Sequence, residues 1–259
     1  MGAVATDGSA GDADYGRIGG AYDRYRRAEP AIARGLLDTL GSARSVCNVG
    51  AGAGSYEPVD RAVVAVEPSS TMRDQRRPDA SPVVAGTAEA LPFADGAFAA
   101  AMTTFSVHQW ADLAGGLAEM RRVARGPVTV LTCDPDLLTG FWLDAYAPEV
   151  VAVEARRYPS LGVLAAGLGG RVHHRPVPIP LRCTDGFNEA YYGRPEALLD
   201  PVARQSCSAW SFVGADVVDR FERQLRTDLD DGTWDDRWGH LRRQPTFAGS
   251  LVLVVSEPD

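Results

Sequence analysis

SVCNVGAGAGSYEP, residues 45–58, joins a short apolar run to a loop that has glycine at every second position, at Gly50, Gly52 and Gly54. Glycine tolerates backbone conformations with positive φ and lets another group approach the main chain closely. In an open α/β sheet, the loop after the first strand lies where ligands bind, at the carboxyl ends of the strands. Three occupants are compatible with this stretch: the phosphates of a dinucleotide, a nucleoside without phosphates, or no ligand beyond a tight turn.

The apolar runs that follow predict an α/β fold with a doubly wound, Rossmann-like parallel sheet. Each run is apolar at nearly every residue, which is typical of strands covered on both faces. Helical patterns alternate with them at 29–40, 69–76 and 113–125, and later at 136–158, broken at Pro148, and at 159–169. A proline-rich run at 174–183 predicts an irregular or edge strand. The buried runs are 45–49, 62–67, 81–86, 98–105, 126–133 and, as the last strand, 250–257.

A single domain is the expected organisation for 259 residues of which 45% are hydrophobic. Residues 1–14 are mostly Gly, Ala, Ser and Asp, so we expect a disordered leader there and order over 15–259. The region at about 134–247 is helical and rich in aromatic residues, which suggests a substrate lid inserted before the last strand.

Composition narrows the partners to small molecules. A net charge of −8 and a pI near 5.1 argue against nucleic acid and anionic membrane as partners. No apolar run has membrane-spanning length and no signal pattern is visible, so we expect a cytoplasmic protein, monomeric or homodimeric. The four cysteines show no metal-site spacing. All 26 basic residues are arginine, which excludes a Walker A lysine, a lysine Schiff base and a lysine general base.

Two residues beyond the glycines favour a nucleoside as the occupant of the loop. The dinucleotide fingerprint G-x-G-x-x-G requires a third glycine where this chain has Ser55. Glu67 ends the second strand, where a carboxylate can accept hydrogen bonds from both hydroxyls of a ribose. NAD and S-adenosylmethionine both contain such a ribose. An NAD-dependent oxidoreductase therefore stays an alternative, disfavoured by Ser55 and by the lack of a Tyr-x-x-x-Lys pair.

The order of the motifs resembles a known family. NVGAGAG, VAVEPSSTM, GTAEALPFADGAF, SVHQW and EMRRVARGPVTVLT follow one another with the gaps found in class I S-adenosylmethionine-dependent methyltransferases of type 11, which are similar to the ubiquinone and menaquinone biosynthesis methyltransferases. The resemblance runs from about Tyr15 to Cys133, which implies a cofactor half at 15–133 and an acceptor and lid region at about 134–247. It implies a seven-stranded sheet with an antiparallel last strand, S-adenosylmethionine as cofactor, and methyl transfer to a small molecule.

The resemblance also implies roles for individual residues. The family usually has acidic residues at the positions of Asn48 and Thr87, so the neutral side chains here should make weaker contacts to the aminoacyl ammonium and to adenine. These two departures keep open a third possibility, a protein that binds S-adenosylmethionine but transfers nothing. The implied cofactor-binding residues are Tyr15, Tyr22, Asn48, Gly50, Gly52, Gly54, Glu67, Pro68, Met72, Thr87, Ala88 and Phe105.

The acceptor side of the site is less defined by the sequence. His108 has an ordinary pKa suited to proton removal near neutrality, and it is either a catalytic base or a residue packed against the sheet edge. The segment around it lacks the NPPY-like motif of amide- and nucleobase-directed methyltransferases, which favours an oxygen or carbon acceptor. Specialised metabolism is the expected setting. Candidate acceptor-binding residues are Trp142, Asp185, Tyr191 and Tyr192.

Overall fold

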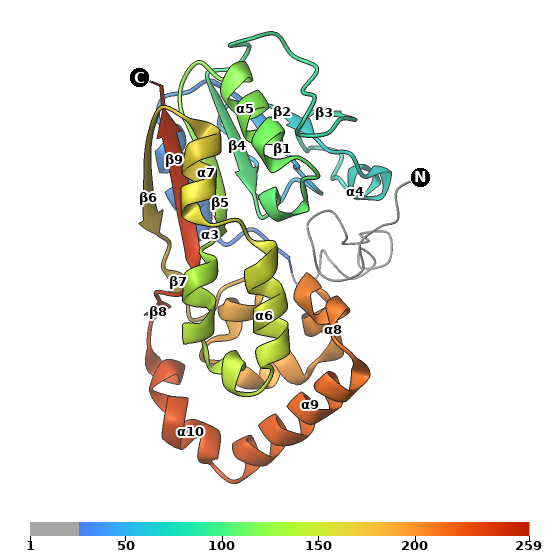
Figure 1. Ribbon diagram of the computed structural model, residues 1–259, viewed down its shortest axis with the longest axis vertical. Helices are drawn as coiled ribbons and strands as arrows, with labels where there is room; N and C mark the ends of the chain where they lie inside the picture. Colours follow the sequence, from blue (N-terminus) through green and yellow to red (C-terminus); the bar gives the residue numbers. More distant parts are fainter. Residues whose placement is uncertain (1–25, 259) are drawn as a thin grey trace.

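The computed structural model describes residues 26–258, and its main feature is a seven-stranded sheet (Figure 1). The strand order is β3-β2-β1-β4-β5-β9-β6, in which β9 runs antiparallel to both of its neighbours, β5 and β6, and the other pairings are parallel. This confirms the doubly wound fold with an antiparallel last strand. Tyr15, Tyr22 and the expected leader lie outside the described residues. The strands are β1 (Ser45–Val49), β2 (Ala62–Val66), β3 (Val83–Val84), β4 (Ala100–Thr104), β5 (Val128–Cys133), β6 (Arg171–Pro176) and β9 (Leu251–Glu257).

Helices bury both faces of the sheet, which explains why the strands are apolar at nearly every residue. On one face α3 (Pro30–Leu40) packs Ile32, Leu36 and Leu40 against residues such as Val46 and Met102. On the other face α5 (Leu113–Val123) and α7 (Leu161–Leu168) cover the alternate strand residues. Strands β1, β2, β4, β5 and β9 thus contribute side chains to two cores.

A group of helices lies beyond the carboxyl ends of the parallel strands (Figure 1). We call this group, with the turns between its helices, the helical lobe. Its aromatic residues continue the core beneath α3. It contains α6 (Pro148–Arg157), α8 (Pro201–Gln205), α9 (Ala215–Asp230), α10 (Thr233–Trp238), the short pair β7 (Ile179–Pro180) and β8 (Thr246–Phe247), and the 3₁₀ turns η3 (Pro135–Gly140), η4 (Trp142–Ala145), η5 (Asn188–Tyr191), η6 (Pro195–Leu199), η7 (Ser208–Phe212) and η8 (Gly239–Arg243).

Two local predictions were wrong in detail. The break expected at Pro148 is confirmed, because α6 begins at this proline, whose missing N–H has no partner to lose in the first turn of a helix. The helix expected before the break is wrong, since two 3₁₀ turns occupy that stretch. The edge strand expected from residue 174 begins at Arg171, where it pairs with β9. Its position at the sheet edge is as the prolines predicted.

Residues 50–61, between β1 and β2, contain turns and bends but no helix. Only the stretch from Ser55 to Arg61 separates the last glycine of the loop from β2, which is too short for a full helix. On the same edge of the sheet, α4 (Ser70–Asp74) follows β2 and η2 (Val107–Gln109) follows β4. In the described part of the chain, no helix combines the length and apolar character needed to cross a membrane.

Candidate functional site

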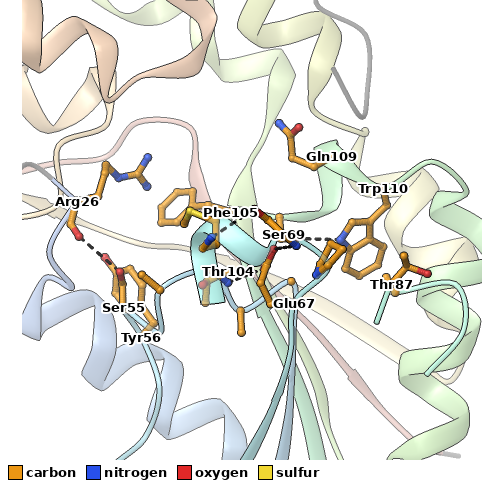
Figure 2. A pocket seen from close by; sticks show the side chains of 18 of the residues that line it. Arg26, Ser55, Tyr56, Glu67, Ser69, Thr87, Thr104, Phe105, Gln109 and Trp110 are labelled. Carbon is orange, nitrogen blue, oxygen red and sulfur yellow. Dashed lines mark hydrogen bonds between the residues drawn. The ribbon is translucent and has the colours of Figure 1, made fainter. Parts of the chain in front are cut away.

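A cavity of about 450 Å³ opens at the carboxyl ends of β1, β2 and β4. Its size is within the range of about 300–1,000 Å³ typical of small-molecule sites. Figure 2 shows Arg26, Ser55 and Tyr56 on one side of this cavity, Glu67 and Ser69 near its middle, and Thr87 and Trp110 on the other side. The lining residues are Arg26, Gly50, Ala51, Gly52, Ala53, Ser55, Tyr56, Glu67, Pro68, Ser69, Met72, Thr87, Ala88, Glu89, Thr104, Phe105, Ser106, Gln109, Trp110, Ala111 and Asp185.

The glycine loop forms the floor of the cavity. Gly50 and Gly52 have φ of 65° and 52°, in the left-handed region that disfavours other residues. A Cβ on Gly50 would lie 1.9 Å from Ser106 Oγ, and one on Gly52 would lie 3.2 Å from Met72 Cε. The backbone N–H groups of Gly50 and Ala51 donate to the Val66 carbonyl, which ties the loop to β2. Glycine at position 50 is therefore required by the protein's own packing.

Glu67 is fixed at the centre of the cavity by two backbone donors. Its Oε2 accepts from Gly52 N–H at 2.8 Å and its Oε1 from Ser69 N–H at 2.9 Å. A carboxylate has about four lone-pair positions, so acceptor capacity remains for a ligand. Ser69 also caps α4 by accepting from Met72 N–H, which places the buried Met72 side chain in the cavity wall.

Trp110 forms the wall of the cavity on the side opposite Arg26 and Tyr56. Trp110 donates its indole N–H to Ser106 Oγ at 2.9 Å and packs over Gly116, where a Cβ would come within 2.5 Å of the ring. Thr87, Ala88 and Glu89 line the same end. Trp110 was not predicted as a site residue, although it is the last residue of the SVHQW motif.

A buried ion pair between Arg26 and Asp185 forms the wall of the cavity on the side opposite Trp110. Arg26 Nε donates to Asp185 Oδ1 at 2.5 Å, and Tyr56 donates its hydroxyl to Asp185 Oδ2 at 2.9 Å. Tyr56 in turn accepts from Glu29 N–H, and burial together with the Asp185 charge raises the pKa of its phenol. The Arg26 guanidinium also lies 5.1 Å from the centre of the Phe105 ring. Arg26 and Tyr56 were not predicted, although Tyr56 directly follows the glycine loop and its Ser55.

Asn48 does not line the cavity. It is 2% exposed and donates its amide to Glu57 Oε1 at 3.1 Å. Glu57 forms a buried ion pair with Arg76 at 2.7 Å, and Arg76 donates to the Gly52 carbonyl at 3.1 Å. Gly54 also lies outside the lining, and a Cβ added to it would lie 3.2 Å from a guanidinium nitrogen of Arg76. The Glu57–Arg76 ion pair therefore supports the glycine loop, because residues 50–61 contain no helix that could do so.

His108 is not placed to act as a base, which corrects one of the two readings of the sequence. It is 5% exposed, lies outside the cavity lining and packs on the Tyr158 ring with 4.6 Å between ring centres. Burial and the nearby charges of Arg157 and Arg26 hold the pKa of the imidazole well below its usual range. The side chain is thus a weak base without access to a ligand.

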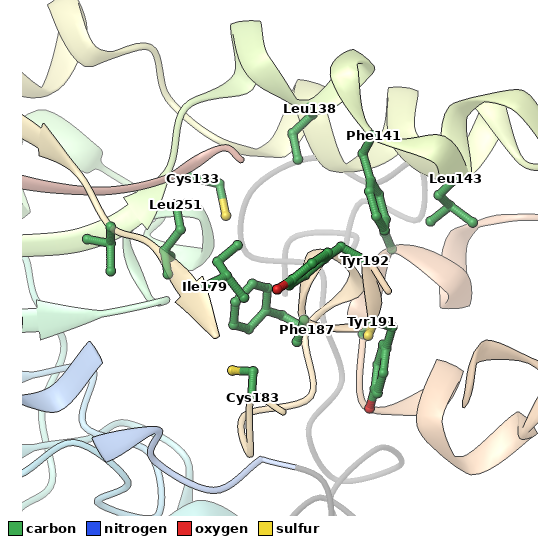
Figure 3. Close-up of a cluster of buried hydrophobic side chains, with 14 of the residues drawn as sticks. Cys133, Leu138, Phe141, Leu143, Ile179, Cys183, Phe187, Tyr191, Tyr192 and Leu251 are labelled. Atoms are coloured by element: carbon green, nitrogen blue, oxygen red, sulfur yellow. The ribbon is translucent and has the colours of Figure 1, made fainter. Parts of the chain in front are cut away.

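Three of the four expected acceptor residues lie in the core of the helical lobe, and Asp185 alone lines the cavity. Trp142 donates its indole N–H to the Tyr192 carbonyl at 3.0 Å. Tyr192 donates to the Gln244 carbonyl at 2.6 Å and stacks on Phe247. Tyr191 is 4% exposed and lies near Arg194. Figure 3 shows Tyr191 and Tyr192 among buried neighbours, so they stabilise the lobe.

The predicted residues that do line the cavity come from the glycine loop, from β2 and α4, and from the segments after β3 and β4. They are Gly50, Gly52, Glu67, Pro68, Met72, Thr87, Ala88, Phe105 and Asp185. Between residues 26 and 258, no three His, Cys, Asp or Glu side chains are grouped so that they could bind a metal ion.

Comparisons with known proteins agree with this geometry. Residues 47–128 match the family model of a methyltransferase domain. The solved structure of an Anabaena variabilis protein, assigned as a methyltransferase from an antibiotic biosynthesis pathway, is 26% identical, with a TM-score of 0.82 over 90% of this chain and 99% of that chain. No curated protein matches the sequence.

Two other solved structures share the fold alone. A Thermotoga maritima S-adenosylmethionine-dependent methyltransferase, given as a possible histamine N-methyltransferase, is 16% identical with a TM-score of 0.52, over 95% of each chain. Geranyl diphosphate C-methyltransferase from Streptomyces coelicolor, solved with S-adenosylhomocysteine, is 16% identical with a TM-score of 0.50, over 88% of this chain and 76% of that chain.

Proposed function

Because this chain is a class I S-adenosylmethionine-dependent methyltransferase, we propose that it methylates an oxygen or carbon atom of a small molecule in specialised metabolism. From one end of the cavity to the other, its lining residues suit the successive parts of the cofactor: adenine, ribose and sulfur. Glu67 would accept from the ribose hydroxyls, Trp110, Met72, Thr87 and Ala88 would enclose adenine, and the glycine loop would pass beneath the sulfur. When bound, the cofactor would supply a sulfonium methyl group, whose carbon the acceptor attacks in line while the carbon–sulfur bond breaks and S-adenosylhomocysteine leaves.

The observation that carries the choice of acceptor is the segment after β4. Thr104, Phe105 and Ser106 line the cavity, and Phe105 has a φ of 51°, which is unusual for a residue other than glycine. This backbone directs the Phe105 ring toward Tyr56 and Phe187, at 6.2 and 5.6 Å between ring centres. Aromatic rings beside the donor would exclude water and orient an acceptor. Positioning of the two reactants in a dry site can supply most of the rate enhancement of methyl transfer. The segment lacks the NPPY-like motif with which amide- and nucleobase-directed methyltransferases hold a planar amine, which supports oxygen or carbon over nitrogen.

The setting and the partners are part of the same proposal. The Anabaena variabilis protein, assigned to an antibiotic biosynthesis pathway, resembles this chain along nearly its whole length, which supports specialised metabolism. The net charge of −8 supports an enzyme that acts on a small molecule and not on nucleic acid, and the lack of a signal pattern supports the cytoplasm as its compartment. We expect a monomer or homodimer.

Calorimetry tests the donor directly. S-adenosylmethionine and S-adenosylhomocysteine should bind, and NAD should not. Binding of NAD without binding of either sulfur nucleoside would overturn the proposed function. Mass spectrometry of small molecules that co-purify with the protein would then identify the acceptor, and an acceptor whose only methylation site is a nitrogen would contradict the oxygen or carbon assignment.

A further inference from the structure

The buried ion pair of Arg26 and Asp185 lies at the end of the cavity opposite Trp110. Both side chains line the cavity, and they are 12% and 2% exposed. The two residues also form an isolated antiparallel bridge between their backbones. Burying two charges costs free energy that their mutual attraction offsets only in part. Such a pair in a cavity wall presents opposite charges, side by side, to whatever binds there.

The donor has a group of matching charge. Its methionine end is an α-amino acid with one ammonium and one carboxylate, both of which need charged or polar partners when they leave water. The cavity carries three carboxylates. Glu67 already accepts two backbone N–H groups in the middle of the cavity, and Glu89 accepts from Asp112 N–H near the Trp110 end. Asn48 is neutral and lies beneath the loop against Glu57.

Asp185 is thus the carboxylate at the end of the cavity where the methionine would lie. Tyr56 connects this carboxylate to the glycine loop, because the tyrosine follows the loop by two residues and donates to Asp185 Oδ2. Its own hydroxyl accepts from Glu29 N–H, and Glu29 accepts from both Thr184 N–H and Thr184 Oγ beside Asp185. The carboxylate is therefore held in one orientation.

Resting on the proposed function, we propose that Arg26 and Asp185 bind the zwitterionic end of the donor. Asp185 accepts from the ammonium, Arg26 donates to the carboxylate, and Tyr56 positions Asp185. The charge expected on the glycine loop is thereby supplied by the segment that leads into the helical lobe, about 130 residues further along the chain. Donor binding then links the lobe to the sheet, next to the aromatic wall where the acceptor binds.

The test compares two ligands that differ only in the amino-acid portion. S-adenosylhomocysteine carries it, whereas 5′-methylthioadenosine has the same nucleoside and sulfur without it. Asp185→Asn should weaken S-adenosylhomocysteine on the order of 10- to 100-fold, as expected for a lost charge-assisted hydrogen bond. The affinity for 5′-methylthioadenosine should stay within about twofold, because the nucleoside contacts are intact.

Asp228→Asn is the matched control. Asp228 also accepts from a tyrosine, Tyr146, at 2.7 Å, but lies in the helical lobe outside the cavity. Both affinities should be unchanged in this variant. If Asp185→Asn lowered the affinity for both ligands equally, the role of Asp185 would be purely structural and the inference would be overturned. An unchanged affinity for S-adenosylhomocysteine would overturn it too. Failure of both ligands to bind the unmodified protein would overturn the proposed function itself.

A second measurement covers the case in which Asp185→Asn does not fold. Decarboxylated S-adenosylmethionine keeps the ammonium but lacks the carboxylate. Arg26→Gln should weaken S-adenosylmethionine on the order of 10-fold and leave the decarboxylated donor within about twofold. Equal losses for the two donors would contradict the assignment of Arg26 to the carboxylate.

Discussion

Glu67→Gln should separate the support that this residue gives to the loop from its contact with the donor. The carboxylate accepts from Gly52 N–H at 2.8 Å and from Ser69 N–H at 2.9 Å. A glutamine oxygen can keep one of these bonds, but its NH₂ group cannot accept the other. We expect unfolding to become easier by about 1.5 kcal/mol, the lower end for a hydrogen bond to a charged group.

Glu67→Gln should lower the affinity for the donor more than the same replacement at another carboxylate of the cavity. Weakening two charge-assisted bonds to the ribose costs about 2 kcal/mol, or roughly a 30-fold higher Kd for S-adenosylhomocysteine by calorimetry. Glu89→Gln is the control, since Glu89 also lines the cavity but accepts a single backbone N–H, from Asp112 at 3.2 Å. Its Kd should change by less than about threefold. A Kd for Glu67→Gln within twofold of the unmodified protein would remove Glu67 from the ribose site.

Three further changes test other parts of the structure. Gly50→Ala should lower the unfolding free energy by at least about 1–2 kcal/mol through its positive φ, with a further loss from the overlap of the new Cβ with Ser106 Oγ; full stability of Gly50→Ala in urea would refute the packing argument. His108→Ala should reduce kcat by less than about tenfold because the residue lies outside the cavity; a larger loss, measured well below the melting temperature, would restore it as a base. Glu189 lies in η5 and accepts from Ser250 N–H, and burial raises the pKa of its carboxyl from 4.5 to about 7. Its contribution to stability is therefore fully present below about pH 4.5 and is lost progressively up to about pH 7, by on the order of 3 kcal/mol. Urea unfolding at about pH 5 and about pH 8 should show this loss, and Glu189→Gln should flatten it; an equally steep pH dependence in the variant would contradict the role of this carboxyl.

The parts of the fold that sequence predicts well are those fixed by local pattern. Continuous apolar runs identify strands buried on both faces, and the glycines at 50 and 52 identify a loop whose backbone needs positive φ. Glu67 follows from its place at the end of the second strand. These features depend on neighbours close in sequence, so a single chain reveals them.

The wall of the site formed by Arg26 and Asp185 could not be predicted in the same way. Arg26, Tyr56 and Asp185 come from three distant segments, and only the folded chain brings them together. His108 has a side chain suited to a base, but it is buried against Tyr158, the residue that ends α6. Only the folded chain brings these two residues together. Trp142 and Tyr192 likewise have side chains common in binding sites, and tertiary packing assigns them to the core.

Transfer of a labelled methyl group tests the central claim most directly. The purified protein is incubated with S-adenosylmethionine carrying a ¹³C-methyl group and with a metabolite extract, and the products are examined by NMR and mass spectrometry. The account predicts a new small molecule with the label on oxygen or carbon, together with S-adenosylhomocysteine in equal amount. Label found only on nitrogen, or no labelled product from a protein that binds the donor, would contradict it.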